Sequence, residues 1–366
     1  MERIERLQQW TGSVLPSALV GFEVASADAS FRRYFRARTA AASYIVMDAP
    51  PSHEDCRPYL HIARLFRAAG ANTPEILAEN LAEGFLLLSD FGNTTYLAAL
   101  TCQSAGALAG SLTPTLYPEG HESRGQREQS LSQNRVDDET ADRLYLDANA
   151  ALIRIQSASR PGELPDYDEA LLLREMRLFP EWYLGRHLQI ELSAEQNALL
   201  DSTFRAILDN NLAQAKVYVH RDWHSRNLMV TEPNPGVLDF QDAVYGPISY
   251  DLVSIYKDAY IHWEEERVLD WVIRYWEAAR KEGLPVPADF ADFYRDFEWM
   301  GVQRHIKVLG IFARLYHRDG KEGYLKDMPL VMHYLRQACG RYNALAPFLR
   351  FLDELEGRQA AVGYTF

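Results

Sequence analysis

Residues 1–90 alternate short apolar segments with polar turns. Five of these segments are rich in aromatic or β-branched residues, which is typical of strands that pair in an antiparallel sheet. Residues 1–20 are expected to form one short helix. From 53 to 69 the spacing of apolar positions predicts a second helix, and Gly70 is placed to end it. The expected strands are 22–24, 30–38, 44–48, 74–79 and 84–89.

The pattern changes after this first part. Residues 101–135 combine Gly, Ser, Gln and charged residues without a sustained apolar period, which predicts a mobile insertion. From residue 138 onward helical periodicity dominates, and only 216–240 is strand-like. The expected helices are 138–158, 168–187, 193–214, 248–280, 288–316 and 321–355. We therefore predict an α+β protein with a small β-rich lobe at 1–90 and a large, mainly helical lobe at 91–366.

The composition narrows the class of protein without indicating a chemistry. The 366 residues are 47% hydrophobic and 24% charged, which is typical of a folded globular chain and excludes a disordered or collagen-like one. A formal net charge of −13 argues against a nucleic acid or an anionic membrane as the main partner. No apolar run reaches the roughly 18 residues of a membrane span. Nothing in the sequence indicates an obligatory protein partner.

The cysteines and the amino terminus favour the cytoplasm. Cys56, Cys102 and Cys339 are too few and too scattered for a disulfide framework or a cysteine-based metal site. The charged residues that follow Met1 do not resemble a secretory signal. We therefore expect a cytoplasmic protein.

The strand-like segment carries the candidate chemistry. A short strand ends at His220, a polar loop follows, and a turn at 232–236 is expected to bring Asn227 and Asp239 to the same end of a hairpin. Their oxygen donors suit a hard cation such as Mg²⁺, whose shell substrate phosphates complete. Asp222, at the head of the loop, is placed to accept a hydroxyl proton. The spacing H-R-D-x-x-x-x-N, followed by a strand Asp, is the arrangement that transfers the γ-phosphoryl group of ATP.

Other interpretations of these polar residues stay open. Asp and Asn side chains in loops often only satisfy their own turn backbones. His220 and His224 have a spacing that zinc sites use, although no third nitrogen or sulfur ligand is near them in the sequence. Residues 90–92, Asp-Phe-Gly, match a kinase metal motif but precede the loop, so we interpret them as a hinge turn ended by glycine.

Segments in both halves of the chain carry a resemblance to a known family. They are Ala29–Arg36, Val46–Pro51, His220–Val230, Gly236–Pro247 and Gln303–Arg314. Through them nearly the whole chain resembles the aminoglycoside phosphotransferase and choline kinase branch of the protein-kinase-like fold. Within that branch it is similar to the bacterial cell-wall recycling kinases that phosphorylate the anomeric hydroxyl of N-acetylmuramate and N-acetylglucosamine.

The resemblance implies a bilobal protein-kinase-like fold and an enzyme that uses ATP and Mg²⁺. It makes Asp222 the catalytic base, puts His224 near the transferred phosphate, and has Asn227 and Asp239 hold the Mg²⁺. Asp251 is expected to brace the loop by accepting hydrogen bonds. Backbone groups of the hinge are expected to bind adenine. The nucleotide-binding residues expected are Ser30, Phe31, Arg32, Arg33, Met47, Leu88, Ser89 and Asp90.

The chain departs from the family pattern where the phosphates would bind. Residues 26–30 replace the glycine-rich phosphate loop with small residues other than glycine. The resemblance puts the family's ATP-binding lysine at Met47 or Asp48 and its glutamate partner near Tyr59, so we expect that the two were lost together. Another cation must then neutralise the phosphates. The candidates are Arg32 and Arg33, one on each face of their strand, with two solvated arginines as the alternative.

The acceptor side favours an acidic sugar. N-acetylmuramate carries a carboxylate, so its site should present a cation, whereas an aminoglycoside site should present several acids. Arg304 and Lys307 share one helix face at i, i+3, and Arg314 follows on the same helix, although an exposed basic face is the alternative. We expect a Mg-ATP-dependent anomeric amino-sugar kinase of peptidoglycan recycling. The alternatives are an aminoglycoside or small-alcohol phosphotransferase and a nucleotide-binding pseudokinase scaffold.

Overall fold

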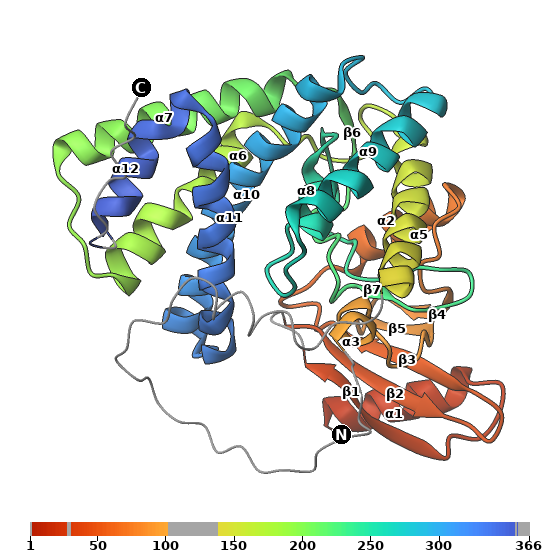
Figure 1. The fold of residues 1–366 in the computed structure, drawn as a ribbon. Coiled ribbons are helices and arrows are strands. Elements are labelled where there is room, and N and C mark those ends of the chain that lie inside the picture. Colours follow the sequence, from red (N-terminus) through yellow and green to blue (C-terminus); the bar gives the residue numbers. More distant parts are fainter. Residues whose placement is uncertain (1, 28–30, 102–137, 356, 358–366) are drawn as a thin grey trace, which may run out of the picture.

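The chain folds into a sheet with two helices, followed by a larger assembly of helices (Figure 1). The computed structural model describes residues 2–27, 31–101, 138–355 and 357, so the insertion expected at 101–135 lies outside the described residues except for its first position. The sheet lies at the lower right of Figure 1, and the helices of the larger part lie above it and to its left. This arrangement confirms the predicted two-lobed α+β fold.

The small lobe is an antiparallel sheet with a helix on each face. Its elements are α1 (Arg3–Val14), β1 (Gly21–Ala27), β2 (Arg33–Arg38), β3 (Ser43–Asp48), α2 (Cys56–Ala68), β4 (Ile76–Asn80) and β5 (Phe85–Ser89), with the strand order β1-β2-β3-β5-β4. Successive side chains of a strand point to opposite faces. On β3, Val46 therefore packs in one cluster with Leu7 of α1, whereas Met47 belongs to the main core with Leu60 of α2.

The large lobe is mainly helical and surrounds one long buried helix. Its helices are α3 (Tyr96–Thr101), α5 (Asp138–Ser157), α6 (Glu169–Met176), the π-helix η1 (Phe179–His187), α7 (Ala194–Ala213), α8 (Tyr250–Tyr256), α9 (Glu265–Lys281), α10 (Phe290–Asp319), η2 (Glu322–Asp327), α11 (Met328–Arg341), η3 (Asn343–Leu345) and α12 (Ala346–Leu355). Every residue of α10 from 297 to 310 is buried. Because charged groups on such a stretch need partners, Arg304 and Lys307 must be paired inside the lobe.

Three of the expected helices are divided, and the segment 168–187 forms α6 and the π-helix η1. The segment 248–280 forms α8 and α9, because the chain leaves the helix after Tyr256 and brings the Asp258 carboxylate to the backbone N–H and the hydroxyl of Ser225. The segment 321–355 forms η2, α11, η3 and α12. Pro329 explains the start of α11, since proline is tolerated in the first turn of a helix but not in its interior.

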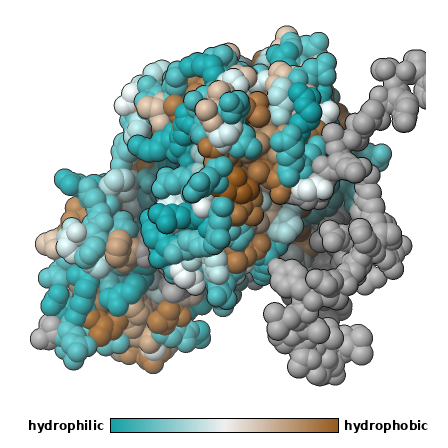
Figure 2. All heavy atoms as spheres, turned by 90° about the vertical axis from the view of Figure 1, so that its left-hand side faces the viewer, coloured by the Kyte–Doolittle hydropathy of each residue, from teal (hydrophilic) through white to brown (hydrophobic). Residues whose placement is uncertain are grey.

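The surface is mostly hydrophilic on the face that carries α7 and α12. Figure 2 views the molecule from that side, and hydrophobic side chains gather there in a few patches between hydrophilic ones. No helix in the described part of the chain is long and apolar enough to cross a membrane.

Candidate active site

Two short strand pairs in the large lobe hold the loop with the candidate chemistry. β6 (Lys216–Val219) pairs with β9 (Val244–Pro247), and β7 (Leu228–Met229) pairs with β8 (Gly236–Val237). The loop 220–227 joins β6 to β7. Inside it, the His224 N–H donates to the Asp222 carbonyl at 2.9 Å and the Asn227 N–H donates to the His224 carbonyl at 2.9 Å. These two turns keep the loop compact.

Asp251 of α8 braces the head of this loop, as the sequence predicted. Its buried carboxylate accepts hydrogen bonds from the backbone N–H groups of His220 (2.7 Å) and Arg221 (3.0 Å). Burial raises the pKa of Asp251 to about 7, and these two hydrogen bonds oppose the rise. The brace matters because Arg221 adopts a φ of 75°, a left-handed backbone that a residue with a side chain rarely takes.

His220 is a structural residue of the loop. Its imidazole is fully buried, and burial lowers its pKa to about 4, so the ring is neutral near pH 7. Nδ1 accepts the Asp222 N–H at 3.2 Å, which assigns the proton to Nε2, and Nε2 donates to the Leu238 carbonyl at 2.9 Å. Both ring nitrogens are occupied. The zinc interpretation of His220 and His224 is therefore wrong for His220.

Asp222 lies among positive charges. Burial alone would raise its pKa, but Lys307, His224, Arg304 and Arg221 together lower it below the ordinary value. The carboxylate is accordingly ionised at neutral pH. An ionised carboxylate at the head of the loop is able to accept a hydrogen bond from a hydroxyl group.

Asn227 and Asp239 come together as the hairpin predicts. The Asn227 amide nitrogen donates to Oδ2 of Asp239 at 3.4 Å and to the Asp222 carbonyl at 3.1 Å. The two side chains lie next to each other and offer one amide oxygen and one carboxylate, which are oxygen donors only. Such a set fits Mg²⁺, which keeps several waters and takes phosphate oxygens from its substrate. Among the described residues no group of three or more His, Cys, Asp or Glu forms a metal site.

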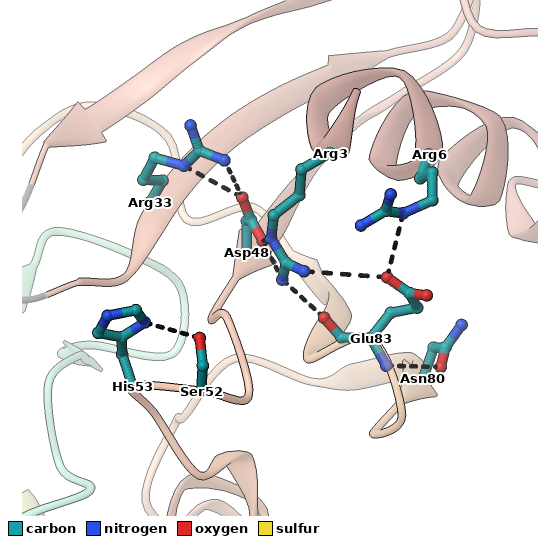
Figure 3. Close-up of polar contacts among 8 residues, drawn as sticks. All are labelled: Arg3, Arg6, Arg33, Asp48, Ser52, His53, Asn80 and Glu83. Atoms are coloured by element: carbon teal, nitrogen blue, oxygen red, sulfur yellow. Dashed lines mark hydrogen bonds and ion pairs between the residues drawn. The ribbon is translucent and has the colours of Figure 1, made fainter. Parts of the chain in front are cut away.

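Arg32 and Arg33 point to different parts of the small lobe. Arg32 has a 10% exposed side chain and lies 3.9 Å from Asp239 across the lobe boundary. Arg33 instead donates to Asp48 on the other face of the sheet. Asp48 is fully buried and also accepts from Arg3 of α1 at 2.8 Å (Figure 3). The structure thus brings Arg32 to Asp239, one of the two candidate metal ligands, and joins Arg33 and α1 through Asp48.

Buried core residues stand at the positions where the resemblance puts the family's lysine–glutamate pair. Met47 is 1% exposed and Tyr59 of α2 is 5% exposed, and both belong to the main core. The Tyr59 ring packs against Phe240, with 4.8 Å between the ring centroids. Phe240 follows Asp239 directly, so this contact connects α2 to the candidate metal site. Asp48, the other position considered for the lysine, faces α1.

The hinge between the lobes is held by an ion pair. Asp90 accepts from Arg36 of β2 at 2.7 Å and from the Gly92 N–H at 2.9 Å, and Gly92 has a φ of 81°. Burial alone would raise the pKa of Asp90, but these donors outweigh it and lower the pKa. The segment is thus a turn ended by glycine, as predicted. Leu88 is buried in β5, where it pairs with Ile45 of β3 and Ile76 of β4, and the Ser89 hydroxyl accepts from the Glu75 N–H at 2.9 Å.

Of the two remaining residues that the sequence predicts to bind the nucleotide, the structure describes only Phe31. Phe31 is 62% exposed, and its ring lies 4.6 Å from that of His53 between centroids. Ser30 lies outside the described residues.

The basic residues of α10 divide into two groups. Lys307 donates to the Tyr250 hydroxyl at 2.9 Å and lies 3.0 Å from Glu175, while Arg304 donates to the Arg221 carbonyl at 3.3 Å. Both are buried behind the loop, so the interpretation as an exposed basic face is wrong for them. Arg314 is partly exposed, and its charged neighbours are Arg318, Asp319 and Glu181 rather than loop residues.

Glu175 is an important residue that the sequence did not reveal. Its carboxylate, 7% exposed, accepts from Tyr167 and Arg221 and from Gln303 at 3.3 Å, besides its ion pair with Lys307. Burial alone would raise the pKa of Glu175, but the charges of Lys307 and Arg221 outweigh it and lower the pKa. No local pattern marks a glutamate on α6 as the partner of groups on α10 and in the loop.

A carboxylate beside an all-oxygen metal site, between a small sheet lobe and a helical lobe, is the arrangement of protein-kinase-like phosphotransferases. The family model described as "Phosphotransferase enzyme family" matches residues 21–116 and 122–291, and the chain belongs to this family. It is an ATP-dependent phosphotransferase.

Relatives similar over the whole chain are named N-acetylmuramate/N-acetylglucosamine kinase. One from Neisseria meningitidis is 47% identical and the alignment covers 100% of both chains. One from Pseudomonas aeruginosa is 44% identical with 98% of each chain covered, and one from Caulobacter vibrioides is 32% identical with 89% of each covered.

Solved structures share the fold at low identity. The choline kinase LicA from Streptococcus pneumoniae superposes with a TM-score of 0.58 at 10% identity, covering 92% of this chain and 100% of its own. An ADP-bound aminoglycoside phosphotransferase superposes with a TM-score of 0.53 at 12% identity, covering 90% of this chain and 97% of its own. These similarities concern the fold alone.

Proposed function

We propose that this protein transfers the γ-phosphoryl group of Mg-ATP to the anomeric hydroxyl of N-acetylmuramate and N-acetylglucosamine, a step of peptidoglycan recycling. The observation that carries the proposal is the loop itself: Asp222, Asn227 and Asp239 converge between the lobes in a chain that is 47% identical to a kinase named for these two sugars. The expected cytoplasmic location suits such a reaction.

Each residue has a distinct part in this mechanism. Asp222 orients the sugar hydroxyl and accepts its proton as the new O–P bond forms. Asn227 and Asp239 would hold Mg²⁺, which when bound neutralises charge on the phosphates. Arg32, 3.9 Å from Asp239, supplies positive charge from the small lobe in place of the missing lysine. His224, two residues after Asp222 in the same loop, would lie near the transferred phosphate.

The low pKa of Asp222 suits an anomeric acceptor. A carboxylate with a lowered pKa is a weak base, and general-base catalysis improves as the acceptor becomes more acidic. An anomeric hydroxyl is more acidic than an ordinary alcohol, so a weakly basic Asp222 is sufficient for it. Little covalent work is then required of the protein beyond positioning.

We also propose that the two lobes meet at the Asp90 turn, with residues 1–90 covering the nucleotide and residues 91–366 holding the sugar. Backbone groups at the hinge would contact adenine, and Phe31 and Met47 would border the nucleotide. Movement of the lobes about this turn would exclude water from the transferred phosphoryl group.

The test is a screen of sugars with Mg-ATP, read by phosphorus NMR of the product. We expect an acid-labile sugar 1-phosphate from both amino sugars, and an Asp222→Asn variant whose kcat falls by about 10²–10⁴. If only aminoglycosides or small alcohols were phosphorylated, the assignment to the phosphotransferase class would stand and the assignment of amino sugars as substrates would be refuted. Nucleotide binding without turnover of any acceptor would instead support the pseudokinase that the Met47 and Tyr59 positions suggest.

A further inference from the structure

The loop contains a second arginine that the network behind Asp222 does not use. Arg226 lies between Ser225 and Asn227, and 37% of its side chain is exposed. Its guanidinium carbon lies 3.5 Å from the centre of the Tyr260 ring. In the described part of the chain, the acid that pairs with it is Asp327 of η2 at 3.9 Å, which is too far for a hydrogen bond. The charge of Arg226 is therefore oriented by stacking rather than neutralised by a close partner.

The backbone beneath Arg226 is firmly held. The Ser225 N–H donates to Asp258 at 3.0 Å, the Ser225 hydroxyl donates to the same carboxylate, and the Ser225 carbonyl accepts from the Leu97 N–H at 2.8 Å. Asp258 is 1% exposed. A side chain that starts from such a fixed backbone loses little freedom when it binds a ligand.

An aromatic platform fixes the plane of the guanidinium. The Tyr260 ring meets the His224 ring edge-on at 5.6 Å and packs against Phe312 at 6.3 Å, and Phe312 packs against Tyr324 at 5.0 Å. A guanidinium that lies flat on a ring keeps its N–H donors in its own plane and free at the edge. That edge matches the two oxygens of a carboxylate.

Asp327 adds the second observation. Its Oδ2 atom is buried and has no hydrogen-bond partner, and burial raises the pKa of this carboxyl group. A buried acceptor without a donor is unfavourable. It stands 3.9 Å from Arg226, whose side chain is 37% exposed against 20% for Arg221, so a carboxylate approaching Arg226 would compete with Asp327 for its charge.

Arg304 and Lys307, the cations expected from the sequence to bind an acidic sugar, are already engaged behind the loop. Arg304 is 6% exposed and bonds to Arg221 and Tyr250, and Lys307 is 5% exposed and pairs with Glu175. Arg226, by contrast, has a side chain that is 37% exposed and is held on the Tyr260 ring.

We propose that Arg226, held on Tyr260, is a specificity-determining residue that binds the carboxylate of N-acetylmuramate and so favours this sugar over N-acetylglucosamine. This inference rests on the proposed function. The two sugars differ by the lactyl group, so the contact contributes to one substrate and not to the other. A charge-assisted hydrogen bond of about 1.5–3 kcal/mol corresponds to roughly a ten- to a hundredfold difference in kcat/KM.

The experiment compares kcat/KM for the two sugars in wild type, Arg226→Gln and Arg280→Gln. Arg280 is a matched control because its guanidinium also stacks on a ring, Trp276, at 4.8 Å, but on the exposed end of α9. In Arg226→Gln we expect the ratio of N-acetylmuramate to N-acetylglucosamine to fall about ten- to a hundredfold. In Arg280→Gln the ratio should stay at the wild-type value.

A second variant works in the opposite direction. Asp327→Asn removes the competing negative charge, so KM for N-acetylmuramate should fall without a comparable change for N-acetylglucosamine. The inference is overturned if Arg226→Gln reduces kcat/KM for both sugars by the same factor and Asp327→Asn leaves the ratio of the two kcat/KM values unchanged. The proposed function then still stands. If wild type phosphorylates neither sugar, both are overturned.

Discussion

Lys307 is the buried cation on which the charge balance behind the loop depends. Its ammonium group donates to the Tyr250 hydroxyl at 2.9 Å and lies 3.0 Å from Glu175, and both charged side chains are 7% exposed. Lys307→Met keeps an unbranched side chain of similar length and removes the charge. We expect this variant to be less stable and to require a higher pH for activity.

The loss of stability follows from the burial of Glu175. Removing one partner of a buried ion pair destabilises a protein by about 3–5 kcal/mol, because the other charge stays buried. In this case Arg221, Tyr167 and Gln303 still donate to Glu175. We therefore expect the lower end of that range, about 3 kcal/mol.

The change in pH dependence follows from Asp222. Burial raises the pKa of Asp222, and Lys307 is first among the charges that lower it. Without Lys307 the pKa of Asp222 rises. Since only the ionised carboxylate accepts the hydroxyl proton, the acid limb of the pH profile of kcat/KM should move to higher pH, and activity should recover as the pH increases.

Urea unfolding followed by tryptophan fluorescence measures the first effect, and sugar-dependent ATP consumption across the acid range measures the second. Lys281→Met, at the exposed end of α9, is the matched control and should change neither. An acid limb in the same place for wild type and Lys307→Met would refute the electrostatic coupling. Equal unfolding free energies would refute the buried ion pair.

Four other substitutions separate the remaining roles. Asp239→Asn should shift the Mg²⁺ titration of ATP turnover to higher concentration, and an unchanged titration would contradict the metal assignment. Arg32→Gln should raise KM for ATP several-fold, whereas Arg33→Gln should mainly lower the melting temperature, because Arg33 pairs with a buried carboxylate. Asp251→Asn should reduce kcat and stability together, since its carboxylate accepts two loop N–H groups, and full retention of both would exclude the brace.

The loop could be predicted from the sequence because its geometry is local. The spacing from Asp222 to Asn227, and a short turn before Asp239, leave few ways to build the hairpin, and the observed pairing of Leu228 with Val237 is one of them. Strand alternation also predicted that Arg32 and Arg33 diverge. The division of the sheet lobe from the helical lobe followed from periodicity alone.

The supports of the loop could not be predicted, because they come from distant parts of the chain. Glu175 meets Lys307 only after α6 and α10 pack, and Asp258 meets Ser225 only where α8 ends. Helical periodicity does not distinguish a buried paired lysine from an exposed one. For the same reason the sequence placed Lys307 on a solvent face as readily as in the site.

The replacement of the family's lysine–glutamate pair has a physical consequence for the small lobe. The strength of an ion pair depends on the charges around it, whereas Met47 and Tyr59 are held by packing that does not depend on charge. Phe240 continues this packing to the residue next to Asp239. The position of α2 is therefore set by the core, and we expect recognition of the phosphates to pass to Arg32, which stands before the first residue of β2 and lies 3.9 Å from Asp239 across the lobe boundary.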